Sequence, residues 1–272
     1  MARTGRVALH ANERVGGMGI AVVHIQNTPL MHNNSVKNTG FVRCTCNLTF
    51  PGCRYPIVFL VGATTTEVMT IKVLAFAGSP RRHGNSETLL DWVLSSMAED
   101  PDVSIEKVPL TEANINICRG CNACEKLNKC VQRDGMDIYH DKIIEADIIL
   151  LSSPIYCMGI AAPPKALIDR MQVFRSRKYV LKLPVIPPER KGKRLGAFLA
   201  SAGQDWPHVF DAAIPSVKCF YHVIDIKDAD ISYLMINHVD EKGAIETHPT
   251  AKADAGRLGK TMIAELKSRL AA

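Results

Sequence analysis

The stretch 71-IKVLAFAGSPRRHGNSET-88 decides the fold of this 272-residue chain. Its first seven residues are apolar except for Lys72, which is typical of a parallel strand that is buried on both faces. A glycine-rich turn follows, and the apolar residues after it recur on one face of a predicted helix: Leu89, Leu90, Val93, Leu94 and Met97. The stretch therefore predicts a strand, a loop and a helix, which together are the building unit of an α/β sheet.

The loop from Gly78 to Thr88 has the features of an anion site, because a glycine-rich loop between a strand and a helix presents free backbone N–H groups and the positive end of the helix dipole. Its candidate side-chain donors are Ser79, Arg81, Asn85, Ser86 and Thr88. Asn85 stands where a P-loop has the lysine that reaches a β- or γ-phosphate, so a monophosphate is the expected guest. The alternative is an ordinary turn in which Asn85 caps the helix.

Strand-like and helix-like segments alternate through the rest of the chain. Further strands are predicted at 103–110, 147–151, 194–201 and 231–236, and helices at 136–145, 163–170 and 255–270. This alternation predicts a doubly wound parallel sheet. The loop at 152–159 follows a predicted strand at its carboxyl end, which is the edge where such sheets bind ligands.

Four cysteines within thirteen residues form a second motif: Cys118, Cys121, Cys124 and Cys130. A cysteine used only for packing has no reason to recur at every third residue. A tight C-x2-C-x2-C run with a nearby fourth cysteine favours an iron–sulfur cluster, whereas structural zinc usually takes two separated pairs. Unliganded or redox-active thiols, a zinc site and a disulfide remain as alternatives, the last without support from any sign of an oxidising compartment.

The charge and hydropathy of the chain argue against a nucleic-acid partner and against a membrane span. Of the net charge of +6, residues 69–272 contribute only +2, from 27 Lys/Arg and 25 Asp/Glu, so a nucleic-acid surface is not indicated. No run reaches the roughly 18 apolar residues that a membrane span needs. Because no apolar signal core follows the N-terminal arginines, we expect a cytoplasmic protein whose nine cysteines are ligands or thiols.

Residues 1–68 show no sustained hydrophobic period, and Met69 directly precedes the first clear strand. We therefore expect residues 1–68 to be a poorly ordered extension, or upstream sequence translated from a start codon assigned too early, and residues 69–272 to form the domain. Cys44, Cys46 and Cys53 in the first segment are interpreted as scattered thiols.

Three stretches in register resemble the iron–sulfur flavoproteins of the NADPH-dependent FMN reductase superfamily: GSPR..GNSET at 78–88, the cysteine run at 118–130 followed by DGMD at 134–137, and SSPIY...PPKALIDR at 152–170. The resemblance covers about residues 70–270. It implies a flavodoxin-like fold, a five-stranded parallel sheet of order 2-1-3-4-5 with the cysteines in an inserted loop at 112–135. It also implies homodimers or homotetramers in which a [4Fe–4S] cluster lies near FMN.

The resemblance also assigns residues to each cofactor by position. By this resemblance, the FMN phosphate is bound by the loop that contains Ser79, Arg81, Asn85, Ser86 and Thr88. The flavin ring is contacted by Pro154, Ile155, Tyr156, Cys157, Gly159, Ser201 and Gly203. Cluster ligation falls to Cys118, Cys121, Cys124 and Cys130. Two features depart from the family pattern, namely Gln204-Asp205-Trp206 in place of a glycine-richer loop and a basic, proline-rich insert at 182–193 that we expect to be solvated.

Together with the anion loop and the cysteine spacing, the resemblance implies an oxidoreductase that couples FMN to a [4Fe–4S] cluster, with NAD(P)H or a ferredoxin as electron donor. No catalytic acid or base is assigned, because the flavin supplies the chemistry. The first alternative is a flavin-only NAD(P)H-dependent FMN or quinone reductase with free thiols. The second is a zinc-stapled, non-enzymatic binding domain on a flavodoxin-like scaffold.

Overall fold

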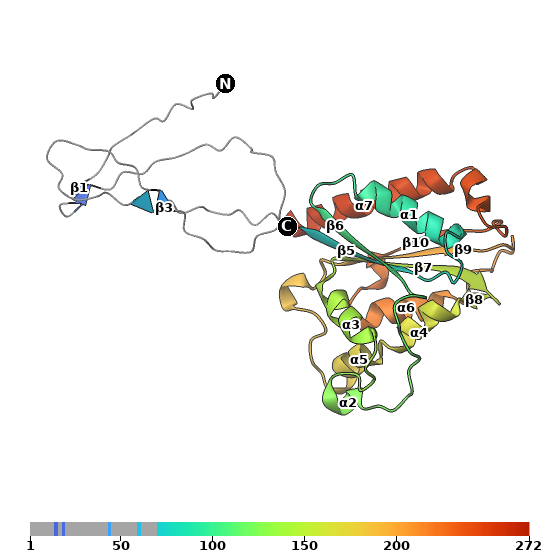
Figure 1. Ribbon diagram of the computed structural model, residues 1–272, viewed down its shortest axis with the longest axis horizontal. Helices are drawn as coiled ribbons and strands as arrows, with labels where there is room; N and C mark the ends of the chain where they lie inside the picture. Colours follow the sequence, from blue (N-terminus) through green and yellow to red (C-terminus); the bar gives the residue numbers. More distant parts are fainter. Residues whose placement is uncertain (1–13, 16–17, 20–42, 45–58, 61–69, 272) are drawn as a thin grey trace, which may run out of the picture. The chain divides into compact units, whose positions relative to one another are not determined.

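The structure is a computed structural model that describes residues 14–15, 18–19, 43–44, 59–60 and 70–271 (Figure 1). The chain divides into two compact units, Met1–Thr66 and Glu67–Ala272. The described residues of the first unit form the antiparallel pairs β1 (Arg14–Val15) with β2 (Met18–Gly19) and β3 (Arg43–Cys44) with β4 (Phe59–Leu60). The predictions for residues 1–68, poor order or a start codon assigned too early, concern positions that lie almost entirely outside the described residues.

The second unit is built on a parallel sheet. Its strands are β5 (Ile71–Ala77), β6 (Val103–Pro109), β7 (Ile148–Tyr156), β9 (Leu195–Ser201) and β10 (Ile231–Ile236), and they lie in the order β6-β5-β7-β9-β10. Counted along the chain these five strands have the order 2-1-3-4-5, so the predicted flavodoxin-like sheet is confirmed. A short strand, β8 (Gly159–Ile160), pairs antiparallel with the end of β7.

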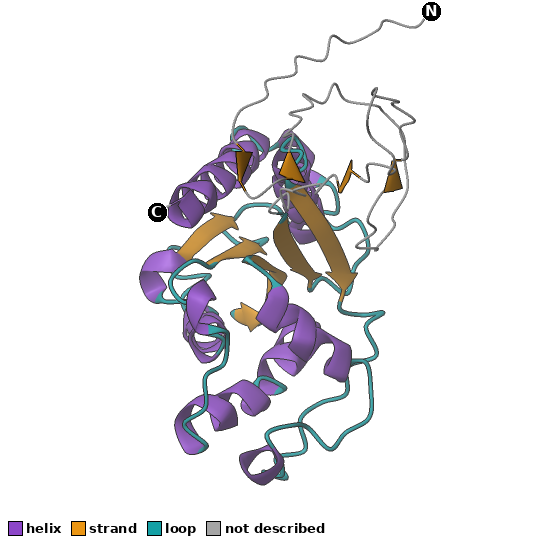
Figure 2. Cartoon of the chain, turned by 90° about the vertical axis from the view of Figure 1, so that its left-hand side faces the viewer, coloured by secondary structure: helices purple, strands orange, loops and turns teal. Residues whose placement is uncertain are grey.

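Helices cover both faces of this sheet (Figure 1, Figure 2). The helices α1 (Asn85–Met97) and α7 (Ala251–Ala271) pack together on one face, and α3 (Met136–Glu145), α4 (Ala162–Asp169) and α6 (Ile214–Val223) lie on the other. Successive residues of β5 enter the two cores alternately, since Val73 and Ala75 pack under α1 whereas Leu74 and Phe76 face the opposite layer. This double burial explains the unbroken apolar run of the strand.

Short elements complete the second unit: α2 (Cys124–Leu127), α5 (Gln172–Arg175), η1 (Ser176–Val180), η2 (Pro188–Arg190), η3 (Asp228–Asp230) and η4 (Ala244–Thr247). Within the described ranges, none of the helices combines the length and the apolar character needed to cross a membrane.

Two segments differ from the sequence-based expectation. Strand β7 extends through Tyr156, beyond the predicted end at Leu151, because Pro154 still pairs with Ser201 of β9 and the next two residues pair with β8. The proline-rich insert at 182–193 is not wholly solvated, since its apolar pair Val185 and Ile186 is buried in the core beneath the sheet.

Candidate functional site

A pocket forms where β5, β7 and β9 end. It is lined by Ser79, Arg81, Gly84, Asn85, Ser86, Pro154, Ile155, Tyr156, Ser201, Gly203, Val239 and Asp240. The pocket thus gathers every residue predicted to contact FMN except Thr88, Cys157 and Gly159. Thr88 lies one turn farther into α1, where its backbone N–H donates to the Gly84 carbonyl, and the other two belong to the hairpin between β7 and β8.

The three loops meet because the strands before them are parallel neighbours in the sheet. Ala77 pairs with Ser152, and the Gly78 N–H donates to the Ser152 carbonyl at 2.9 Å. A Cβ on Gly78 would lie 2.2 Å from Pro164 Cγ and 2.3 Å from the Ser152 oxygen. Glycine is therefore required at this position by close approach of the backbone, and any larger residue would push the loops apart.

The loop at residues 78–88, the anion loop, provides no side-chain cap for the start of α1. Gly84 occupies the N-cap position and the helix has no side-chain cap, so the alternative in which Asn85 caps the helix is wrong. The first N–H groups of a helix have no partner within the helix, and they are therefore free to bind an anion. The Ser79 hydroxyl closes the loop by donating to the Arg81 carbonyl at 2.9 Å and accepting the Arg81 N–H at 3.1 Å.

The Asn85 side chain is directed to a fourth loop. Its Nδ2 donates to the carbonyls of Val239 and Glu241, both at 2.9 Å, and its Oδ1 accepts the backbone N–H of Gly243 at 3.0 Å. These bonds occupy the amide and fix the loop that carries Val239 and Asp240 beside the pocket. Asp240 reaches over Gly203, where a Cβ would lie 2.3 Å from its Oδ1.

Glu87 holds the backbone of the anion loop through a hydrogen bond, and the sequence analysis did not identify this residue. Its side chain is 2% exposed; Oε2 accepts the His83 N–H at 2.7 Å and Oε1 lies 2.8 Å from Lys107 Nζ. Burial alone would raise the pKa of Glu87, but the hydrogen bonds from Lys107 and His83 outweigh it and lower the pKa below its ordinary value. His83 has φ +53°, so this carboxylate holds a left-handed backbone position in the loop.

The hairpin at the end of β7 is ordered by Ser153, whose hydroxyl accepts the Ala161 N–H at 3.0 Å and donates to the Pro154 carbonyl at 2.7 Å. Its two-residue turn consists of Cys157 and Met158, at φ +49° and +65°, which is the backbone of a tight primed turn. The turn leaves Tyr156 43% exposed at the pocket.

All four motif cysteines line a second pocket, of ≈ 40 Å³, together with Arg119, Gly120, Asn122, Val131, Gln132, Arg170, Gln172 and Val173. The described thiols are free, and Gly120, Asn122 and Asn128 in the same loop have left-handed backbone conformations. In the part of the chain that the structure describes, no three His, Cys, Asp or Glu residues are arranged to hold a metal ion. The four thiols therefore line one pocket, but they do not converge on a position for a single metal ion.

A buried ion pair anchors the cysteine loop. Arg170, at the end of α4, and Asp134, before α3, are each 1% exposed in their side chains and pair through both guanidinium nitrogens, at 2.5 and 2.9 Å. Burial would raise the pKa of Asp134, but hydrogen bonds from Arg170 and from the Asn116 and Met136 N–H groups hold it well below its usual range. The pair fixes both ends of the loop to the helical layer.

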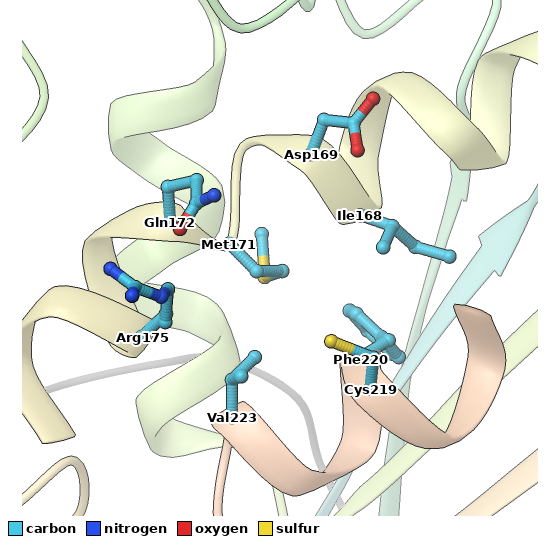
Figure 3. Close-up of a pocket in the computed structure, with 8 residues that line it drawn as sticks. All are labelled: Ile168, Asp169, Met171, Gln172, Arg175, Cys219, Phe220 and Val223. Carbon is cyan, nitrogen blue, oxygen red and sulfur yellow. The ribbon is translucent and has the colours of Figure 1, made fainter. Parts of the chain in front are cut away.

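A third cavity, of ≈ 260 Å³, lies between α4–α5 and α6 (Figure 3). It is lined by Ile168, Asp169, Met171, Gln172, Arg175, Cys219, Phe220 and Val223. None of the residues predicted for either cofactor lines this cavity, and its exposed Cys219 lies outside the cysteine motif.

Residues 71–206 match the family described as NADPH-dependent FMN reductase. An iron-sulfur flavoprotein of Archaeoglobus fulgidus is 35% identical over 137 residues, which cover 50% of this chain and 57% of that protein. An iron-sulfur flavoprotein of Methanocaldococcus jannaschii is 38% identical over 105 residues, 39% of this chain and 54% of the relative. The chain thus spans little more than half the length of these relatives.

Among solved structures, an azoreductase from Bacillus anthracis aligns with a TM-score of 0.52 at 15% identity, and the alignment covers 71% of this chain and 100% of the azoreductase. At this level of identity the likeness shows the shared fold alone.

Proposed function

The chain belongs to the NADPH-dependent FMN reductase family, and from this premise we propose that it is an FMN-dependent oxidoreductase that couples FMN to a [4Fe–4S] cluster. The main support is the grouping of side chains: three loops predicted to hold FMN line one pocket, and all four motif cysteines line another. We further propose NAD(P)H or a ferredoxin as the electron donor, a homodimer or homotetramer as the assembly, and the cytoplasm as the location.

The FMN phosphate would be held by the first N–H groups of α1 and by Arg81, which is exposed at the pocket. The flavin ring would contact Pro154, Ile155 and Tyr156 on one side and the loop at Ser201 and Gly203 on the other. Asn85 acts in this proposal through the loop that it fixes, because its amide already has backbone partners.

The cluster would be held by Cys118, Cys121, Cys124 and Cys130. A [4Fe–4S] cluster binds its four cysteine ligands at four separate corners. Thiols that line one pocket therefore suit a cluster better than they suit a single metal ion, because the thiolate ligands of one ion must all lie about 2.3 Å from the same centre. When bound, FMN exchanges electrons in pairs or singly and the cluster exchanges one at a time, so the two connect a two-electron donor with a one-electron partner.

A flavin-only reductase with free thiols is the second candidate. It needs no metal ligation, and the described motif thiols are free of disulfide bonds, as such an enzyme requires. Both candidates use the same FMN pocket and differ only at the cysteine loop.

The visible absorption spectrum of anaerobically purified protein, with iron, sulfide and FMN assayed on the same sample, separates the candidates. Flavin peaks over a broad brown absorbance with about four irons per chain support the two-cofactor proposal. Flavin peaks alone, persisting after reconstitution with iron and sulfide, contradict it and favour the flavin-only enzyme. Colourless protein with one zinc per chain contradicts both.

We expect Glu87→Gln to weaken FMN binding about fivefold, or by about 1 kcal/mol, because a charged acceptor stabilises its hydrogen-bond partners by more than a neutral amide does. The substitution keeps the size of the side chain but removes the charge that holds the His83 N–H and Lys107. The dissociation constant is measured by quenching of flavin fluorescence on addition of apoprotein.

The matched control for this substitution is Asp91→Asn. Asp91 also pairs with Lys107, at 2.7 Å, but it lies within α1, beyond the loop at 78–88. Equal FMN affinity for Glu87→Gln and Asp91→Asn would contradict a role of Glu87 in positioning the loop.

A further inference from the structure

Arg170 connects two short segments to which no cofactor contact is assigned, PPKALIDR at 163–170 and DGMD at 134–137. It is the last residue of the segment PPKALIDR, and Asp134 is the first residue of DGMD. The Arg170 Nη1 donates to the Asn116 carbonyl at 2.9 Å as well as to Asp134 Oδ2. Its Nη2 donates to Asp134 Oδ1 at 2.9 Å and to Cys130 Sγ at 3.5 Å.

The contact between Arg170 and Cys130 is partly buried, and the surrounding hydrogen bonds hold it in place. The Arg170 side chain is 1% exposed, and two parallel hydrogen bonds to Asp134 fix the plane of its guanidinium. One N–H of Nη2 points to Asp134 while the other is available to the sulfur, because each terminal nitrogen of arginine carries two hydrogens. The Asp134 carboxylate therefore orients the Arg170 guanidinium toward Cys130, one of the four motif cysteines.

We infer that Arg170 is a positioning residue that hydrogen-bonds the Cys130 ligand and raises the reduction potential of the bound cluster. This inference rests on the proposed function. Reduction adds one electron and no proton, so the reduced cluster is more negative by one charge. A charge-assisted donor on a ligand sulfur stabilises that state more than the oxidised state, and hydrogen bonds to the sulfurs are among the factors that set cluster potentials.

The test is an anaerobic reductive titration with dithionite, followed by electron paramagnetic resonance of the reduced cluster, on the wild-type holoprotein and two variants. Arg170→Lys keeps the charge, but an ammonium cannot form the planar fork that reaches both Asp134 and Cys130. Arg170→Met combined with Asp134→Asn removes the donor without leaving a buried charge unpaired. Arg175→Lys is the matched control, since Arg175 is exposed and pairs with Glu125 on α2.

We expect both Arg170 variants to retain iron and FMN while the equilibrium constant for one-electron reduction of the cluster falls at least tenfold, which is about 59 mV. The control should keep the wild-type potential. Variants that hold iron at the wild-type potential would overturn the inference, and loss of iron from both variants with FMN retained would also overturn it, in favour of a purely structural role. If Arg170→Lys does not fold, the double variant decides. A wild-type protein without a cluster would instead refute the proposed function.

Discussion

Replacing Cys121 by serine is expected to abolish the iron–sulfur cluster and to leave FMN bound. Cys121 is the central cysteine of the C-x2-C-x2-C run and lines the same pocket as the other three. A serine hydroxyl is a much poorer ligand than a thiolate for cluster iron, so the loss should be complete, from about four irons per chain to none. Iron, sulfide and FMN are assayed on the same anaerobic sample.

The flavin should survive this substitution because the two pockets share no lining residue. Cys219→Ser is the control, since Cys219 is also exposed but lies in the separate cavity beside α6 (Figure 3). Full iron and sulfide in the Cys121→Ser protein would refute the ligand assignment. Loss of iron in the Cys219→Ser protein as well would mean that the assay reports general damage.

Replacing Arg194 by methionine is expected to lower the free energy of unfolding by about 3–5 kcal/mol, because each buried carbonyl left without a donor costs about 1–3 kcal/mol. The Arg194 side chain is 1% exposed. Its Nε donates to the Ala146 carbonyl at 2.9 Å, its Nη1 to the Ile224 carbonyl at 2.7 Å, and its Nη2 to the Ile143 carbonyl. These carbonyls lie at the carboxyl-terminal ends of α3 and α6, where the helix dipoles favour a cation.

Burial, together with repulsion from Arg190, lowers the pKa of Arg194 to about 10. The group therefore remains protonated at neutral pH, and methionine removes a charge as well as the donors. Stability is measured by urea unfolding followed by circular dichroism. Lys191→Met is the control, because Lys191 is exposed three residues away on the same segment. A change below about 1 kcal/mol, as is usual for surface positions, would contradict the structural role of Arg194.

Local sequence determined the fold class and the two groups of candidate ligands. A buried parallel strand leaves an unbroken apolar run, and a helix leaves a 3.6-residue period, so 71–97 could be interpreted without reference to the rest of the chain. The spacing of the four cysteines likewise depends only on neighbouring residues. Because parallel strands end at the same edge of a sheet, the loops predicted for FMN also had to meet.

The tertiary structure alone decided what the supporting polar side chains do. Asn85 was a plausible anion donor by sequence, but its partners lie more than 150 residues away in the loop at 239–245. Glu87, Asp134, Arg170 and Arg194 gave no periodic signal, since a single charged residue in a sequence is indistinguishable from a solvated one. Their roles come from burial, which makes a charge depend on a specific partner, and that partner is brought near only when the sheet and its helices have packed.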